Sequence, residues 1–193
     1  MACNVLKHRL IRAVLFSGLS ILPISAYSTQ QLCQETDIVA TTPSTRFEQH
    51  DNGTVTDTVT GLMWQRCLIG QSANGCTLGT ADTFTWAEAL IYPSQKTQQS
   101  TLAGYRDWRL PNIRELASII ELQCSHPAIN LAIFPNNGAG HLWSSSPYRF
   151  YTHYSWFLDF NDGLFIYGDR QDKKSIRLVR DIRPIHPESL HQN

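Results

Sequence analysis

The densest group of charged side chains lies in residues 104–120, GYRDWRLPNIRELASII, directly before and inside a predicted helix. Guanidinium groups close to a helix N-terminus can bind an anion, because the free N–H groups and the cations attract the same ligand. Acidic side chains are almost as frequent here, the nearest being Asp107 and Glu115. Their available partners are Arg109, Arg114 and an arginine of the last strand. We favour internal ion pairs that hold the fold together over an anion site.

A second group combines aromatic and cationic side chains in residues 147–156, PYRFYTHYSW, and the stretch YGDRQDKKS at 167–175 adds further cations. Aromatic rings stack on the C–H faces of sugars or on arginine, while hydroxyl and guanidinium groups orient the ligand. This pattern predicts a ligand-binding surface, and the alternative is an aromatic loop packed on its own core. The predicted binding residues are Tyr148, Arg149, Tyr151, His153, Tyr154, Arg170, Lys173 and Lys174.

Other stretches that could carry chemistry are weaker. WSSSP at 143–147 has no G-x-S-x-G frame and no local base, so we expect its serines to bond backbone groups where a strand leaves the sheet. DNGTVTD at 51–57 and DFNDG at 159–163 lack EF-hand spacing and indicate turns rather than calcium sites. The histidines are dispersed. We predict no catalytic residues, no metal site and no cofactor, hence no enzyme.

Four of the five cysteines, Cys33, Cys67, Cys76 and Cys124, follow the N-terminal apolar segment, whereas Cys3 precedes it. An even number of cysteines in an exported chain is typical of two disulfides. We favour Cys67–Cys76, which closes a short loop, together with Cys33–Cys124, which ties the N-terminal segment to the region after the second helix. Zinc is the alternative, but the chain has no C-x-x-C motif.

The first 26 residues are typical of a secretory signal peptide. Three basic residues precede an apolar run at 13–24, and the small residue Ala26 suits a cleavage site. The run is shorter than the roughly 20 residues that a spanning helix needs, so an uncleaved anchor is the weaker alternative. We expect a periplasmic, secreted or cell-surface protein without a transmembrane segment in its mature part.

Cleavage near Ala26 removes three basic and no acidic residues, which leaves 13 basic against 16 acidic and a net charge of −3. A negative chain lacks the basic footprint of a nucleic-acid-binding protein. With 42% hydrophobic and 10% aromatic residues, the chain is expected to fold rather than to be disordered.

The order of predicted elements is strands, two helices, then strands, which favours an α+β fold. Asn52-Gly53 and Thr60-Gly61 predict tight turns of a β-meander. Residues 84–92 and 110–120 carry cap-like spacing and apolar stripes, which predict two short amphipathic helices. The later strands are predicted at 141–146, 155–160, 164–170 and 175–181.

These elements give a predicted domain organisation for the whole chain. The divisions are a signal peptide at 1–26, a polar N-terminal tail at 27–44, one domain at 45–183 and a polar C-terminal tail at 184–193.

Five motifs in order resemble the Lcl C-terminal domain family, named for the C-terminal domain of a collagen-like bacterial surface adhesin. They lie within about residues 47–180 and are DNGTVTDTVTGLMWQRC, FTWAEAL, GYRDWRLPNIRELASII, LWSSSPY and IRLVRD. The resemblance implies a C-type-lectin-like scaffold, with a mixed or antiparallel sheet and two flanking helices, here stapled by disulfides. It also implies an exported, non-enzymatic domain, and the adhesin that gives the family its name binds sulfated glycans.

We therefore expect a carbohydrate-binding or adhesive domain, with anionic polysaccharides among its ligands. The alternative is a protein-interaction subunit of a surface or envelope assembly. The chain carries no collagen-like repeats, so avidity supplied by a trimeric stalk is not expected here.

Overall fold

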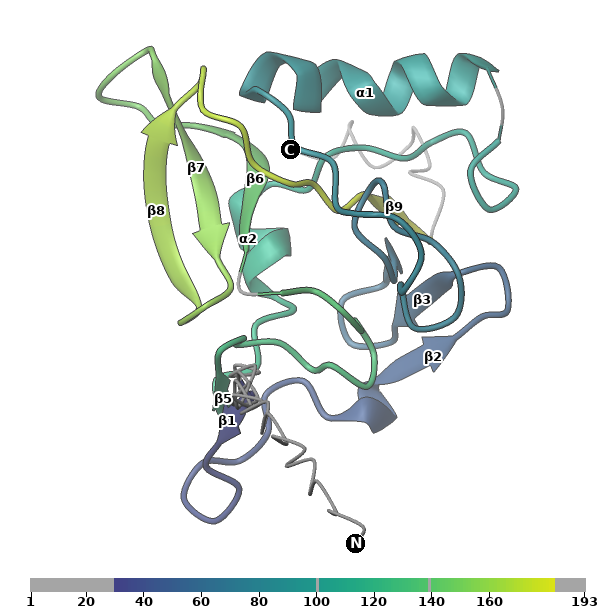
Figure 1. Ribbon diagram of the computed structural model, residues 1–193, viewed down its shortest axis with the longest axis vertical. Coiled ribbons are helices and arrows are strands. Elements are labelled where there is room, and N and C mark those ends of the chain that lie inside the picture. Colours follow the sequence, from purple (N-terminus) through teal and green to yellow (C-terminus); the bar gives the residue numbers. More distant parts are fainter. Residues whose placement is uncertain (1–29, 100, 139, 183–193) are drawn as a thin grey trace, which may run out of the picture.

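The computed structural model describes residues 30–99, 101–138 and 140–182 (Figure 1). The predicted signal peptide and C-terminal tail lie outside the described residues. The described part contains antiparallel sheets of two, three and four strands together with two α-helices. It is therefore an α+β protein in which sheet predominates, and the α+β class predicted from the sequence is confirmed.

The four-stranded sheet has the order β2-β3-β4-β9. Its first three strands form the predicted meander, because the turn glycines adopt the left-handed conformation, with φ 79° at Gly53 and φ 72° at Gly61. The last strand of the described chain returns to pair with β4. The strands are β2 (Phe47–Gln49), β3 (Thr54–Asp57), β4 (Leu62–Gln65) and β9 (Val179–Asp181).

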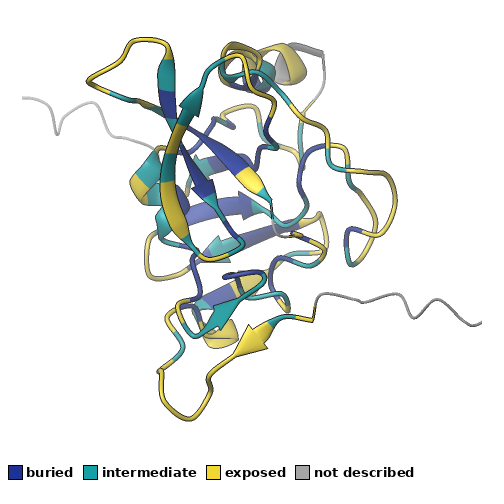
Figure 2. Ribbon diagram, turned by 60° about the vertical axis from the view of Figure 1, so that its left-hand side comes forward, coloured by how far each residue is buried: buried dark blue, intermediate teal, exposed yellow. Residues whose placement is uncertain are grey.

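The three-stranded sheet is formed by β6 (His141–Pro147), β7 (Tyr154–Asp159) and β8 (Leu164–Asp169), in that order. Between Trp143 and Pro147 the pairing of β6 with β7 is irregular. β8 lies at the margin of the molecule, and Figure 2 shows that its residues are mostly exposed or half-buried.

The predicted strand at 175–181 pairs as a regular strand only at its end, in β9. The preceding residues run between the two larger sheets: Ser175 accepts a hydrogen bond from the Trp143 N–H at 3.0 Å, and Leu178 accepts one from the Gln65 N–H at 3.1 Å. This segment therefore joins the three-stranded sheet to the four-stranded sheet.

Both predicted helices are present, but their bounds differ from the predicted ranges. The second helix, α2 (Ile113–Ala117), has a complete capping box between Asn112 and Glu115, but it is shorter than the predicted 110–120 because Ser118 caps it. The first helix, α1 (Trp86–Gln99), is longer than the predicted 84–92 and continues through Pro93. Thr85 and Glu88 exchange the predicted capping hydrogen bonds.

The described part of the N-terminal segment, predicted as a polar tail tied to the domain by a disulfide, packs on the domain. Strand β1 (Leu32–Cys33) pairs with β5 (Cys124–Ser125), and the Cys33–Cys124 disulfide crosses this small sheet. The second disulfide joins Cys67 to Cys76. Both pairings are those favoured from the sequence.

Two apolar clusters fill the space between the sheets and helices. One surrounds α2 and includes Trp64, Leu116 and Leu158. The other lies toward α1 and includes Trp143 and Phe157. Because β6 and β7 contribute side chains to both clusters, the central residues of these strands are buried on both faces of the sheet.

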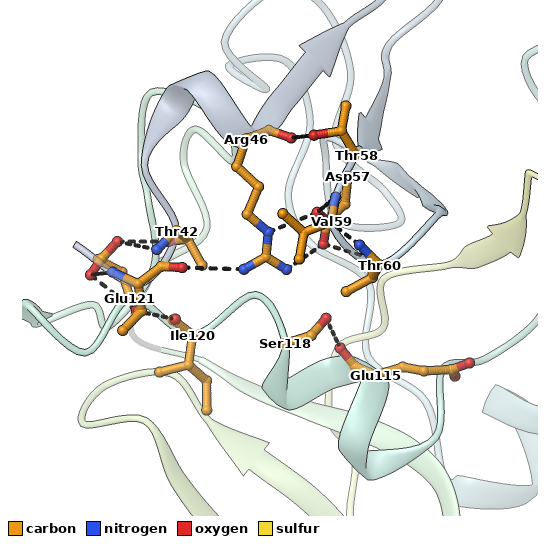
Figure 3. Close-up of polar contacts among 11 residues, drawn as sticks. Thr42, Arg46, Asp57, Thr58, Val59, Thr60, Glu115, Ser118, Ile120 and Glu121 are labelled. Carbon is orange, nitrogen blue, oxygen red and sulfur yellow. Dashed lines mark hydrogen bonds and ion pairs between the residues drawn. The ribbon is translucent and has the colours of Figure 1, made fainter. Parts of the chain in front are cut away.

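A polar network holds the N-terminal segment against the loop after α2 (Figure 3). The buried carboxylate of Glu121 accepts hydrogen bonds from the backbone N–H groups of Thr41 at 2.9 Å and Thr42 at 2.8 Å, and from the Thr42 hydroxyl at 2.8 Å. Beside it, Arg46 forms a salt bridge with the buried Asp57. Burial acts to raise the pKa of Glu121, but hydrogen bonds from Thr41 and Gln123 outweigh it and lower this pKa.

Arg177 is fully buried, and no carboxylate pairs with it among the described residues. Its guanidinium group donates to the Gln65 carbonyl at 2.6 Å, to the Arg66 carbonyl and to the Asn137 side chain at 2.7 Å. The same group lies 4.7 Å from the centre of the Phe134 ring. Burial and, to a smaller extent, the positive charge of Arg66 lower the pKa of Arg177 to about 9.

We predict that Arg177→Met lowers the free energy of unfolding by about 3–5 kcal/mol, because three acceptors beside a fully buried site lose their donor. Urea unfolding at neutral pH measures this change. Arg114→Met, at an exposed position, is the matched control and should change stability by less than about 0.5 kcal/mol. Equal stability of Arg177→Met and the unsubstituted protein would contradict the role assigned to Arg177.

We also predict that Glu121→Gln destabilises the fold by about 2–3 kcal/mol at neutral pH, because an amide cannot accept all of the hydrogen bonds that the carboxylate accepts. The folded-state pKa is below the ordinary value of 4.5, so the carboxylate stabilises fully above that pH and loses its contribution as pH falls further. The difference between the two proteins should therefore shrink below about pH 4.5.

Denaturant unfolding at several pH values checks this behaviour. Glu48→Gln removes the same charge at an exposed position of β2 and serves as the control. A Glu121→Gln deficit that stays constant into the acid range would be inconsistent with an ionised Glu121 in the folded protein.

Candidate functional site

The predicted binding segment forms the connection between β6 and β7, and its rings gather with one ring of β8. We call this group the aromatic surface. Its members are Tyr148, Phe150, Tyr151, Tyr154, Trp156 and Tyr167.

Strand register explains why these rings meet. Trp156 of β7 lies directly opposite Tyr167 of β8, so both side chains point to the same face of the sheet. Tyr154 is two residues before Trp156 and therefore shares that face. Tyr167 was missing from the predicted binding residues, although its strand alternation with Phe165 is a signal that could have identified it.

Tyr148 lies at the centre of the group. Its ring stacks on Tyr167 with centroids 4.2 Å apart and an interplanar angle of 18°, and on Tyr151 at 6.1 Å and 24°. Phe150 and Trp156 meet it edge-on, with centroids at 5.6 Å and 5.2 Å. Four neighbouring rings therefore pack against Tyr148, which is half-buried. Its main role is to hold the other rings in place.

The outer rings are open to solvent. Phe150 is 68% exposed, Tyr151 54% and Tyr167 45%. The loop is therefore ordered by ring packing at its centre while large apolar rings remain accessible at its periphery. Apolar rings that gather on a surface in this way are characteristic of interaction sites.

Two of the predicted cationic residues, Arg149 and His153, accompany the rings of the aromatic surface. Arg149 is exposed and lies 5.1 Å from the centre of the Phe150 ring. His153 is exposed, with its ring 4.2 Å from Tyr154. Arg170 lies on the opposite face of the sheet. Its half-buried side chain packs 4.1 Å from the Trp86 ring and donates from Nε at 2.9 Å to the hydroxyl of Ser155, which points away from the aromatic surface.

The two predicted lysines do not join this group. Lys174 is buried, and its Nζ lies 4.5 Å from the centre of the Trp143 ring and 3.1 Å from the Asp172 carboxylate. The prediction that Lys174 belongs to a solvent-facing patch is therefore wrong. Its aliphatic stem fits an apolar site while its ammonium group remains paired, which sequence alone does not reveal. Lys173 lies beside α1 and lines a cleft of about 270 Å³ with Glu88 and Tyr92.

The charged run at 104–120 forms internal ion pairs, as favoured from the sequence. Arg109 pairs with Glu115 at 2.7 Å and with Asp181 at 3.0 Å. The Arg180 guanidinium hydrogen-bonds Asp107 at 2.8 Å and holds the pKa of that carboxyl below its ordinary value. These pairs connect the start of α2 to β9.

The serines of WSSSP also bond backbone groups, as expected. Ser144 donates its hydroxyl to the Trp156 carbonyl at 2.7 Å, and Ser146 accepts from the Ile113 N–H at 3.0 Å through its hydroxyl. Within residues 30–99, 101–138 and 140–182, no three His, Cys, Asp or Glu side chains are grouped so that they could hold a metal ion.

A polar cleft of about 800 Å³ lies between the β2–β3 turn and the loop closed by Cys67–Cys76. Its lining includes His50, Asp51 and Arg66, together with much backbone of the loop. None of the residues predicted from the sequence to bind a ligand lines this cleft.

The described residues include no helix long and apolar enough to cross a membrane. Residues 53–180 match the family model described as the Lcl C-terminal domain, which covers more than half of the chain. A search of the curated proteins gives no match to this chain.

We predict that Tyr148→Ala destabilises the fold by about 2–3 kcal/mol, because it removes the ring that the others pack against. Tyr151→Ala should change the free energy of unfolding by less than about 1 kcal/mol, since its ring is largely exposed. Thermal and urea unfolding of the two variants measure the difference. Similar losses for both would mean that the centre of the aromatic surface is misassigned.

Proposed function

Because the chain belongs to the Lcl C-terminal domain family, we propose that it is an exported, non-enzymatic binding domain that recognises carbohydrate, including anionic polysaccharide, at the aromatic surface. The observation that carries this proposal is the exposure of Phe150, Tyr151 and Tyr167 beside the exposed cation Arg149. Exposed aromatic rings can stack on sugar rings, and a nearby guanidinium group can bind their acidic substituents.

The geometry supports binding without large rearrangement. The stack centred on Tyr148 fixes the orientation of Tyr151 and Tyr167 before a ligand arrives, which limits the entropy lost on binding. Ring faces would contact the C–H face of a sugar, and Arg149 would donate hydrogen bonds to a carboxylate or sulfate group. The surface is shallow, so we expect weak binding to each sugar unit and a preference for chains over single sugars.

The same family resemblance supports a C-type-lectin-like scaffold, to which the antiparallel sheets, two helices and two disulfides are suited. The disulfides support a periplasmic, secreted or cell-surface location, because such bonds persist in oxidising compartments. The ion pairs of the 104–120 run and the backbone bonds of the WSSSP serines support a structural rather than catalytic use of these groups.

A protein-interaction subunit of a surface or envelope assembly is the second candidate. The exposed apolar side chain of Phe165 favours it, because Phe165 lies on the same face of β8 as Tyr167 and extends the aromatic surface along the strand. Such side chains suit a protein partner more than a sugar.

We predict that Tyr151→Ala and Phe150→Ala each weaken binding to a polysaccharide by at least about tenfold, equivalent to about 1.4 kcal/mol. A glycan array with the purified protein identifies the ligand, and titration with the best polysaccharide gives the affinities. Leu122→Ala is the matched control, because Leu122 is 62% exposed at a distant position. It should bind like the unsubstituted protein.

The charge contribution is tested with Arg149→Gln against Lys96→Gln, an exposed cation on α1. For a sulfated or uronic-acid polysaccharide, Arg149→Gln alone should weaken binding and reduce its dependence on salt. If no neutral or anionic polysaccharide binds above background at low salt, the carbohydrate proposal fails, and a specific protein recovered by crosslinking in envelope fractions would favour the second candidate.

A further inference from the structure

The two edges of the β6-β7-β8 sheet differ. The outer edge of β6 is covered, because Trp143 donates to Ser175 at 3.0 Å and Ser175 donates to His141 at 3.1 Å. The outer edge of β8 has no neighbouring strand among the described residues, and Figure 1 shows β8 at the border of the molecule.

The direction of the outward backbone groups follows from the pairing. The Tyr148 N–H donates to the Tyr154 carbonyl at 3.1 Å, so Tyr154 of β7 turns its backbone groups toward β6, and alternation turns those of Phe157 toward its β8 partner Ile166. Alternation then places the backbone groups of Ile166 toward β7 and those of Phe165 and Tyr167 outward. None of the described backbone groups bonds to the N–H or C=O of these two residues.

Edge strands are usually protected by lysine, proline or a bulge. The sequence of β8, LFIYGD, contains no lysine or proline, and its pairing with β7 is regular over all six residues. Leu164 is 53% exposed and Phe165 52%. A regular, apolar and uncovered edge is the surface on which another strand adds.

We propose that β8 pairs in antiparallel orientation with β8 of a second copy of this chain, around a two-fold axis perpendicular to the sheet at Ile166. In this arrangement Ile166 faces itself, and Phe165 lies opposite Tyr167 of the other copy. The outward N–H and C=O groups of Phe165 and Tyr167 then bond to each other on both sides of the axis. The two three-stranded sheets become one continuous sheet of six strands.

Side-chain chemistry supports this register. Two cross-strand aromatic pairs form between Phe165 and Tyr167 on one face, and aromatic pairs are among the favourable pairs in antiparallel sheets.

A second copy fits better than an unrelated strand, because one segment supplies both members of each pair. An isologous interface of this kind closes after two copies and leaves no further open edge. The rings of the aromatic surface project from the sheet face, so edge pairing leaves Phe150 and Tyr151 accessible. The inference therefore does not depend on the ligand of that surface.

A cysteine substitution tests the register directly. At a non-hydrogen-bonded antiparallel pair the Cα atoms are about 4.5 Å apart, within reach of a disulfide. Ile166→Cys should therefore form a covalent dimer under mild oxidation. Leu164→Cys is the matched control, because its symmetry mate would be four residues away along the strand, about 13 Å. It should remain uncrosslinked.

A second test avoids replacing the half-buried Ile166. Phe165→Pro removes only an outward N–H and leaves the hydrogen bonds between β7 and β8 intact, so the chain should fold but sediment with half the mass of the unsubstituted dimer. Phe165→Val retains the N–H and strand preference, and it should remain dimeric. Sedimentation across a range of concentrations, with circular dichroism to confirm folding, gives the masses.

The proposal is overturned if the unsubstituted protein remains monomeric at the highest concentrations. It is also overturned if Phe165→Pro dimerises as well as Phe165→Val, or if Leu164→Cys crosslinks as readily as Ile166→Cys. Protection of the β8 edge from exchange in a protein that stays monomeric would show that another part of the same chain covers it.

Discussion

The architecture depends on one buried cation. Arg177 bonds the carbonyls at the end of β4 and the Asn137 side chain, and no carboxylate neutralises it among the described residues. A guanidinium group so deeply buried requires all of its acceptors in position at once. The residues on either side, Ile176 and Leu178, enter the apolar cluster near α1. The segment that contains Arg177 can therefore occupy only one path, between the two larger sheets.

That path determines which surfaces are left exposed. Ser175 covers the edge of β6, and Val179 pairs with β4 and with Arg109. The Arg109 side chain in turn binds Glu115 at the start of α2. The contact of Ser175 attaches the β6 edge of the three-stranded sheet to this segment, and the other contacts attach the segment to the four-stranded sheet and α2. β8 receives none of them, and the aromatic surface and the open edge both lie on this outer part.

Local signals in the sequence were sufficient to predict several features of the fold. Turn glycines such as Gly53, the Asn112–Glu115 capping box and the cysteine pairing each depend on residues whose own chemistry limits the alternatives. Burial of single charges was not predictable in the same way. Lys174 looks like a surface cation in sequence, yet three-dimensional packing places it between rings beside Asp172. Tyr167 lies in a different strand from the loop that it completes, so only the β7–β8 register brings it to Tyr148.

The two proposals concern the same outer sheet and reinforce each other physically. A shallow aromatic surface buries little area on one sugar, so a single copy gives weak binding. Pairing of β8 with a second copy would place two aromatic surfaces on one face of a continuous sheet, in a fixed relation to each other. A polysaccharide that contacts both binds the second at a high effective concentration. Two-fold pairing would thus supply multivalency to the aromatic surface.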